Sequence, residues 1–326
     1  MLLCLCLTCW LDSCRLIVAI GVLLKLRDPS FFMAKQPTLS VDQIKRLMVK
    51  AILSDDKLFE NLVLKGGNAI DLIHQITARA SVDIDFSMPD DFPGGAEELH
   101  WRVERALTST FRQEGYHVFD LKMVEKPEHL SEDMADFWGG YGFEFKLISE
   151  ALSKAHGSDI RELRNYALSL GRGTKFLIDV SRHEYVDHKQ SMDFEGYVIY
   201  VYSPEMIVCE KLRAVCQQMP EYGPIIRRTR PGSARARDFV DIYYLVTMLG
   251  LDVITDEYRA VIAEMFERKR VPLPLLGRIH AYREFHRADF AAVQATISPS
   301  IVLKDFDTYF DFTLGLVDRL ESLWNV

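Results

Sequence analysis

One segment, residues 64–87 (LKGGNAIDLIHQITARASVDIDFS), constrains the fold of this chain more than any other. A short apolar run leads into a Gly-Gly turn, and an amphipathic stretch that predicts a helix follows it. Over residues 81–88, apolar side chains then alternate with polar ones, which predicts a half-buried strand. The segment therefore predicts strand, turn, helix and strand in close succession, with a polar strand face open to a ligand.

Two carboxylates share that polar face. Asp83 and Asp85 are two residues apart, so their Cα atoms lie roughly 6.6 Å apart and both side chains can reach one cation. Two such charges about 4 Å apart repel by about 4 kcal/mol at an effective dielectric of about 20, which favours a bound cation. Mg²⁺ commonly joins carboxylates to substrate phosphates. Gly66 and Gly67 would let the backbone approach a phosphate bound at the start of the next helix.

A later stretch, residues 174–181 (TKFLIDVS), predicts an apolar strand with one acid in its middle. We expect that acid, Asp179, to be the third metal ligand, because three carboxylates can hold two metal ions for phosphoryl chemistry. An Asp-x-Asp pair by itself is more often simply solvated, and it also occurs in glycosyltransferases. The ordered series of glycine turn, helix and two acidic strands favours nucleotidyl transfer over both interpretations.

Three motifs in this chain resemble those of the AbiEii/AbiGii family of nucleotidyltransferase toxins, from type IV toxin–antitoxin systems. The first is LKGGNAIDL…RASVDIDFS, with Asn68 where the family often has Thr. The second is PEMIVCEKLRAV at 204–215, and the third is RARDFVDIYYL at 235–245. Together they extend over about residues 62–245, and three motifs in this order are a specific signal.

The resemblance implies an α/β fold of the polymerase-β-like type, with a mixed sheet, flanking helices and a helical C-terminal region. It also implies Mg²⁺ or Mn²⁺ as cofactor and a nucleoside triphosphate as substrate. Family members inhibit growth, in the setting of abortive infection, and some transfer nucleotides to the 3′ end of tRNA. For this chain we therefore expect tRNA as acceptor and a cognate antitoxin as protein partner.

The motifs also suggest the residues that handle the nucleotide. Gly66, Gly67 and Ser81 are expected to position the phosphates. Lys211 would neutralise the triphosphate as a point charge, and Arg213 would bind it more weakly. Asp238 would hold Lys211 or Arg237 in place, or take part in proton transfer, and Arg237 would contact the nucleotide. The structural alternatives are a surface lysine and an acid favoured by the helix dipole.

Five arginines gather near one predicted loop, residues 219–234, in a chain whose net charge is −8. Arginine suits phosphate recognition, so this loop is a candidate for binding the triphosphate or the tRNA backbone. A solvated linker is the alternative. Tyr222 in the same loop is a weaker candidate for stacking on a base. The arginines are Arg227, Arg228, Arg230, Arg235 and Arg237.

The chain divides into three predicted parts. Residues 1–32 hold four of the six cysteines and a short apolar run; we expect a mis-assigned start or a disordered leader, with a weak membrane anchor as the alternative. Residues 34–203 mix predicted strands and helices and should form the nucleotidyltransferase domain. Residues 204–326 are almost wholly helical and should contribute to the active-site cleft.

Composition is that of an ordinary globular protein, and a net charge of −8 argues against nonspecific coating of nucleic acid. We expect a cytoplasmic enzyme without stable membrane association. Two alternatives remain open. One is a nucleotidyltransferase with a small-molecule acceptor, which salt-sensitive tRNA binding would separate from the first hypothesis. The other is a non-catalytic nucleotide-binding regulator on the same fold.

Overall fold

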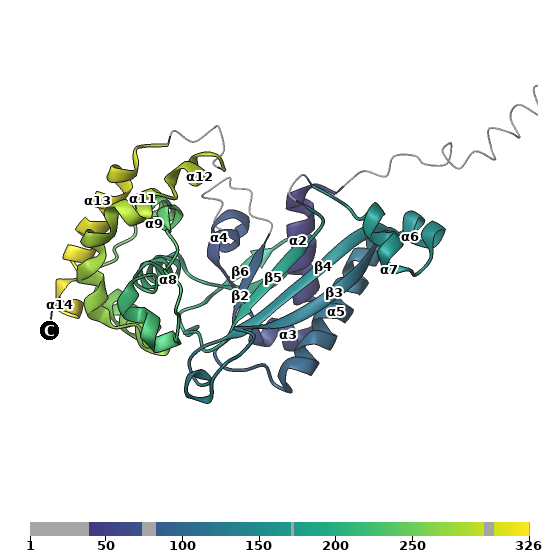
Figure 1. The fold of residues 1–326 in the computed structure, drawn as a ribbon, viewed down its shortest axis with the longest axis horizontal. Coiled ribbons are helices and arrows are strands. Elements are labelled where there is room, and N and C mark those ends of the chain that lie inside the picture. Colours follow the sequence, from purple (N-terminus) through teal and green to yellow (C-terminus); the bar gives the residue numbers. More distant parts are fainter. Residues whose placement is uncertain (1–38, 74–82, 171–172, 297–302, 326) are drawn as a thin grey trace, which may run out of the picture. The chain divides into compact units, whose positions relative to one another are not determined.

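The computed structural model describes residues 39–73, 83–170, 173–296 and 303–325 (Figure 1). The predicted leader at residues 1–32 and the candidate Ser81 lie outside these ranges. Val41–Val326 form one compact unit, and the predicted boundary between residues 203 and 204 falls inside it. Within the described part of the chain, no helix is both long and apolar enough to cross a membrane.

A seven-stranded mixed sheet forms the α/β part and confirms the predicted fold class (Figure 1). Its strand order is β3-β4-β5-β2-β1-β7-β6. The pairs β2–β5 and β1–β7 are parallel, and the other pairs are antiparallel. The strands are β1 (Val63–Lys65), β2 (Ile84–Ser87), β3 (Tyr116–Lys126), β4 (Gly140–Ser149), β5 (Phe176–Ser181), β6 (Gln190–Phe194) and β7 (Tyr197–Val201).

Helices of 3 to 19 residues connect and cover these strands. The pair α2 and α5 pack against each other, and α5 also contacts β3. The predicted helix after β1 begins at the glycines themselves, as α4, and continues as a π-helical turn, η2, to Ile73. The elements are α2 (Val41–Leu53), α3 (Asp56–Asn61), α4 (Gly66–Asn68), η2 (Ala69–Ile73), α5 (Gly95–Gln113), η3 (Glu132–Met134), α6 (Glu150–His156), α7 (Ile160–Leu163) and η4 (Arg164–Tyr166).

The second half of the described chain is helical, as predicted. One difference is the loop expected at residues 219–234, where residues 220–226 form the 3-10 helix η5. The elements are α8 (Pro204–Cys216), η5 (Pro220–Ile226), α9 (Ala236–Leu249), α10 (Asp256–Arg268), η6 (Leu273–Tyr282), α11 (Arg283–Arg287), α12 (Phe290–Gln294), α13 (Phe306–Asp318) and α14 (Glu321–Trp324).

Helix α8 is the central element of this half. The Ser203 side chain caps it by accepting a hydrogen bond from the Met206 amide, and Pro204 occupies its first turn. It packs against α9, α10 and η6, so most of its residues are buried, including two that carry charge. Those two are Lys211 and Arg213. Because buried charges need partners, we expect acidic side chains to lie next to Lys211 and Arg213.

Candidate active site

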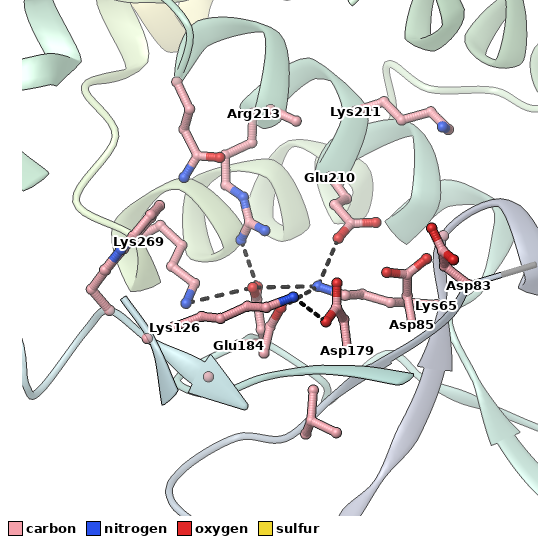
Figure 2. Close-up of a pocket in the computed structure, with 18 of the residues that line it drawn as sticks. Lys65, Asp83, Asp85, Lys126, Asp179, Glu184, Glu210, Lys211, Arg213 and Lys269 are labelled. Atoms are coloured by element: carbon pink, nitrogen blue, oxygen red, sulfur yellow. Dashed lines mark hydrogen bonds and ion pairs between the residues drawn. The ribbon is translucent and has the colours of Figure 1, made fainter. Parts of the chain in front are cut away.

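A pocket of about 790 Å³ lies between the sheet and the helices α8 and α9 (Figure 2). It is lined by every predicted site residue except Ser81, which is outside the described residues. Residues far apart in the sequence therefore meet where the α/β and helical parts come together. The predicted residues in its lining are Gly66, Gly67, Asp83, Asp85, Asp179, Lys211, Arg213, Arg237 and Asp238.

The strand register sets a row of pocket residues across the sheet. Lys65 on β1 is paired with Asp85 on β2, and Asp85 is paired in turn with Asp179 on β5. Asp179 is paired on its other side with Gly142 of β4. Directly paired residues point to the same face of a sheet, so the two predicted acids lie side by side. Asp83 precedes β2 by one residue and lines the same pocket.

The glycine turn is tied closely to the acidic strand. Gly66 has a φ of +69°, and a Cβ atom there would lie 3.0 Å from an Asp85 carboxylate oxygen. The Asn68 side chain donates a hydrogen bond to the backbone carbonyl of Asp83. The turn therefore needs glycine both for its backbone conformation and for the space beside Asp85.

Asp83 and Asp85 are harder to ionise than ordinary aspartates. Burial raises the pKa of Asp85 to about 7 despite the charge of Lys65, and the nearby carboxylates Glu210, Asp179 and Asp83 add to the rise. Burial and the charge of Asp179 also raise the pKa of Asp83. A cation placed among these oxygens would favour their ionised forms. The donor set, carboxylates alone, suits a hard cation such as Mg²⁺.

The three acids are not gathered around a common point in this structure. Among the described residues, no group of three or more His, Cys, Asp or Glu side chains is arranged to hold a metal ion. Asp179 instead forms an ion pair with Lys126, the last residue of β3. Gly142 makes room for this pair, because a Cβ there would lie 3.2 Å from Asp179 Oδ1 and closer still to Lys126.

Next to the acids lies a buried ion network that the sequence analysis missed. Figure 2 shows Lys65 between two glutamates, with its Nζ 3.1 Å from Glu210 Oε1 and 3.6 Å from Glu184 Oε1. Arg213 Nη1 donates to Glu184 Oε2 at 2.8 Å. Lys269 Nζ lies 3.5 Å from Glu184 Oε1. Lys65, Glu210 and Arg213 lie in the first two motifs, and Arg213 was a predicted nucleotide contact. Glu184 and Lys269 lie outside all three motifs, so the sequence offers no signal for these two.

Glu184 stays ionised at the centre of this network. Burial works against its charge, but Arg213, Lys269 and Lys65 outweigh burial and hold the pKa of this carboxyl well below its usual range. Burial lowers the pKa of Lys269 to about 8, against the attraction of Glu184. Arg213, expected to contact the nucleotide, is thus already engaged with Glu184 and with the Met265 carbonyl.

Lys211 is held by two acids from α9. Its Nζ lies 3.1 Å from Asp238 Oδ1 and 2.7 Å from Asp241 Oδ2, and all three side chains are buried. Asp238 also accepts a hydrogen bond from Arg235. Burial opposes ionisation of Asp238, but the charges of Arg235 and Lys211 hold its pKa low. The predicted contact between Asp238 and Lys211 is therefore present.

The predicted arginine patch divides into two groups. Arg230, Arg235 and Arg237 line the pocket. Arg228 instead donates to three carbonyl groups at the end of α8, and Arg227 pairs with an acid on η3. These two are engaged with protein groups and are not part of the pocket lining.

The suggestion that Tyr222 stacks on a base is wrong. Its ring is fully buried, and its hydroxyl donates to the Lys269 carbonyl at 2.6 Å. The sequence placed it in a loop, but the chain there folds into η5 and turns the ring inward.

Comparison with known protein families gives one match that covers most of the chain. The model of the family described as "Nucleotidyl transferase AbiEii toxin, Type IV TA system" matches residues 46–312. Those residues include every element that lines the pocket. A comparison with curated proteins gives no match.

Solved structures resemble the chain only remotely. JHP933 from Helicobacter pylori is 15% identical, with a TM-score of 0.42 over 87% of this chain and 91% of that one. A candidate nucleotidyltransferase from H. pylori is also 15% identical, with a TM-score of 0.44 over 87% and 95%. An antigenic nucleotidyltransferase-like protein from Paracoccidioides brasiliensis is 14% identical, with a TM-score of 0.32 over 78% and 95%.

Proposed function

Since this chain belongs to the AbiEii family, the nucleotidyl transferase toxins of type IV toxin–antitoxin systems, we propose that the pocket beside Asp85 is its active site. In the proposed reaction, an acceptor hydroxyl attacks the α-phosphate of a nucleoside triphosphate. The bond from that phosphorus to the oxygen leading to the β-phosphate breaks, pyrophosphate leaves, and the proton of the attacking hydroxyl passes to solvent. The observation that supports this most is the row formed by Asp85 and Asp179, with Asp83 in the same pocket lining.

Asp83, Asp85 and Asp179 are the proposed ligands of Mg²⁺ or Mn²⁺. When bound, the metal would polarise the α-phosphate and lower the pKa of the attacking hydroxyl. An all-carboxylate donor set and the resistance of Asp85 to ionisation both fit a site meant for a cation. Lys126 would have to leave Asp179, and its side chain, 53% exposed, has the freedom to do so.

The triphosphate would be held by cationic groups and by the glycine turn. Lys126, once released from Asp179, would find its new partner in a phosphate oxygen. Lys211 would act from a fixed position, because Asp238 and Asp241 restrain its ammonium group. Asp238 would be a positioning residue and not a proton acceptor, since its lowered pKa makes it a poor base. Gly66, Gly67 and Ser81 complete the proposed phosphate site.

The proposed acceptor is the 3′ end of tRNA. Three arginines in the pocket lining, Arg230, Arg235 and Arg237, give an acidic protein a local positive surface that suits an RNA backbone. A cognate antitoxin as partner, growth inhibition of the abortive-infection type and a cytoplasmic location complete the proposal.

Incorporation of labelled nucleotide tests this function directly. The wild type and an Asp83→Ala, Asp85→Ala double variant would each receive Mg²⁺, one of four α-labelled triphosphates and total tRNA. A matched control is Asp256→Ala, Asp318→Ala, which removes two exposed acids outside the pocket. We expect label in tRNA with the wild type and the control, and none with the double variant.

Two outcomes would count against the proposal. Equal labelling by the Asp83→Ala, Asp85→Ala variant would reject the site assignment. Label that enters a small molecule of a cell extract and never RNA would reject tRNA as the acceptor but keep the chemistry. Nucleotide binding without transfer to any acceptor would favour a regulator.

A further inference from the structure

The pocket lining contains an aromatic side chain that the proposed chemistry does not use. Trp138 lies just before β4 and is partly exposed. Tyr141 also lines the pocket, but its ring is buried and its hydroxyl donates to Asp91 at 2.7 Å. In the described lining, Trp138 is therefore the one aromatic residue with exposed surface to offer a ligand.

The chain holds Trp138 in a defined place. Its backbone N–H donates to the Met134 carbonyl at 2.9 Å, which continues the turn begun by η3. Its ring centroid lies 6.1 Å from that of the buried Tyr222. Gly139, at a φ of +114°, redirects the chain into β4. A ring fixed in this way loses little conformational freedom when it binds a ligand.

A buried cation lies against the same indole ring. Lys269 Nζ is 5.4 Å from the ring centroid, within the range of a cation–π contact. That ammonium is itself fixed, because it donates to the Arg182 carbonyl at 2.6 Å and lies near Glu184. The ring is thus supported by the buried ion network, and it lines the pocket from the network's side.

The distance from Trp138 to the acids suits one nucleotide. Gly142 of β4 is paired with Asp179, and Gly140 with Ser181. Each step of two residues along a strand covers about 7 Å, and Trp138 precedes Gly142 by four residues, so at most two such steps of chain separate it from the acidic row. The α-phosphate, ribose and base of one nucleotide together extend over a comparable length. A phosphate at the acids would therefore place a base near the indole.

We propose that Trp138 is the nucleobase-stacking residue of this pocket. The inference rests on the proposed function, because it takes the acidic row as the place of the reacting phosphate. The stacked base would be that of the incoming triphosphate or that of the 3′-terminal nucleotide of the acceptor. Stacking tolerates every base, so Trp138 would add affinity without selecting one nucleotide.

Calorimetric titration of the full-length protein tests this without measuring turnover. The ligands are a nucleoside triphosphate, inorganic tripolyphosphate, which has no base, and a short RNA with a free 3′-hydroxyl, each with Mg²⁺. The variants are Trp138→Ala, Trp138→Phe and a control, Trp101→Ala. Trp101 lies on α5, outside the pocket, and is 49% exposed. Trp138→Phe keeps a ring in place should the smaller residue disturb folding.

We expect Trp138→Ala to weaken binding of the base-bearing ligand roughly 5- to 150-fold and to leave tripolyphosphate binding unchanged. Trp138→Phe should recover most of the loss, and Trp101→Ala should bind like the wild type. A loss seen with the triphosphate assigns the incoming base to Trp138, and a loss confined to RNA assigns the acceptor base.

Two results would overturn the inference alone. In one, Trp138→Ala binds every ligand like the wild type. In the other, it weakens triphosphate and tripolyphosphate equally, which would indicate a structural role. A wild type that binds none of the ligands would instead reject the proposed function, and the inference with it.

Discussion

At the scale of single residues, Glu184 is a buried carboxylate at the centre of the ion network. Its carboxylate is 3% exposed and meets three cationic side chains, Lys65, Arg213 and Lys269. A buried charge of this kind contributes stability only while its partners are present, and removing one partner leaves the others uncompensated. Glu184 pairs with Lys65 at the end of β1 and with Arg213 on α8. It therefore links the strand before the glycine turn to helix α8.

Glu184→Gln should lower the free energy of unfolding by about 3 kcal/mol at pH 7, because three buried cations lose their counter-charge. The folded pKa of Glu184 is lowered, so its stabilising effect is present above the unfolded value of about 4.3 and is lost as the pH falls through the folded pKa. Urea unfolding at pH 7, 5 and 3 should show the gap between wild type and variant shrinking only below about pH 4.

The exposed Glu257, 80% accessible, provides the control, since Glu257→Gln should match the wild type at each pH. A gap between Glu184→Gln and the wild type that stays constant down to pH 3 would show that Glu184 is not the titrating group.

At the scale of elements, the turn from β1 into α4 brings the backbone against the acidic strand. Gly66 and Gly250 share a left-handed backbone, with φ of +69° and +62°. A Cβ at Gly66 would press on Asp85, whereas nothing lies within 4 Å of the place a Cβ would take at Gly250. The two glycines therefore separate backbone strain from contact with the site.

Gly66→Ala and Gly250→Ala should each cost about 1–2 kcal/mol of stability, because alanine is strained in this backbone region. Gly66→Ala alone should also reduce kcat/KM, on the order of 100-fold, because a displaced Asp85 misaligns the reacting groups. Urea unfolding and nucleotide-transfer rates on the same preparations would check both. Equal activities in the two variants would mean that the space beside Asp85 is unimportant.

The elements also show what a sequence can and cannot reveal. Alternation predicted β2, because a strand's period fixes which side chains share a face, and an apolar run with one acid predicted β5. The motif order placed Asp85 and Asp179 in one site, and the two strands are paired there. The partners of Lys65 could not be foreseen, since Glu184 and Glu210 reach it only through the strand order and the seating of α8. Strand β6 was missed because it is a polar edge strand, held by a two-residue turn.

At the scale of the whole molecule, the pocket is shared by both parts of the compact unit. The sheet contributes Asp85 and Asp179, helices α8 and α9 contribute Lys211 and Asp238, and Lys269 follows α10. A ligand that contacts all of these segments binds the folded chain and not the unfolded one. Its binding free energy is thereby added to the stability of the whole unit.

A nucleoside triphosphate with Mg²⁺ at about 100 times its Kd should stabilise the protein by about 2.7 kcal/mol, enough to raise Tm by several degrees. Thermal unfolding with and without ligand would measure this. The Asp83→Ala, Asp85→Ala variant should show no such rise, while Asp256→Ala, Asp318→Ala should behave like the wild type. An equal rise in the first variant would place the ligand elsewhere.

The ion pair between Lys126 and Asp179 has a consequence for how the pocket responds to its surroundings. Lys126 belongs to the same chain as Asp179, so dilution or dialysis cannot remove its ammonium group from the site. A cation that binds Asp179 would therefore have to displace the Lys126 ammonium group, as in ion exchange. The displaced ammonium group would stay within a side-chain length of the site. A divalent cation would bring two positive charges where the ammonium group brought one. The displaced Lys126 would then be available to bind an anion that enters the pocket.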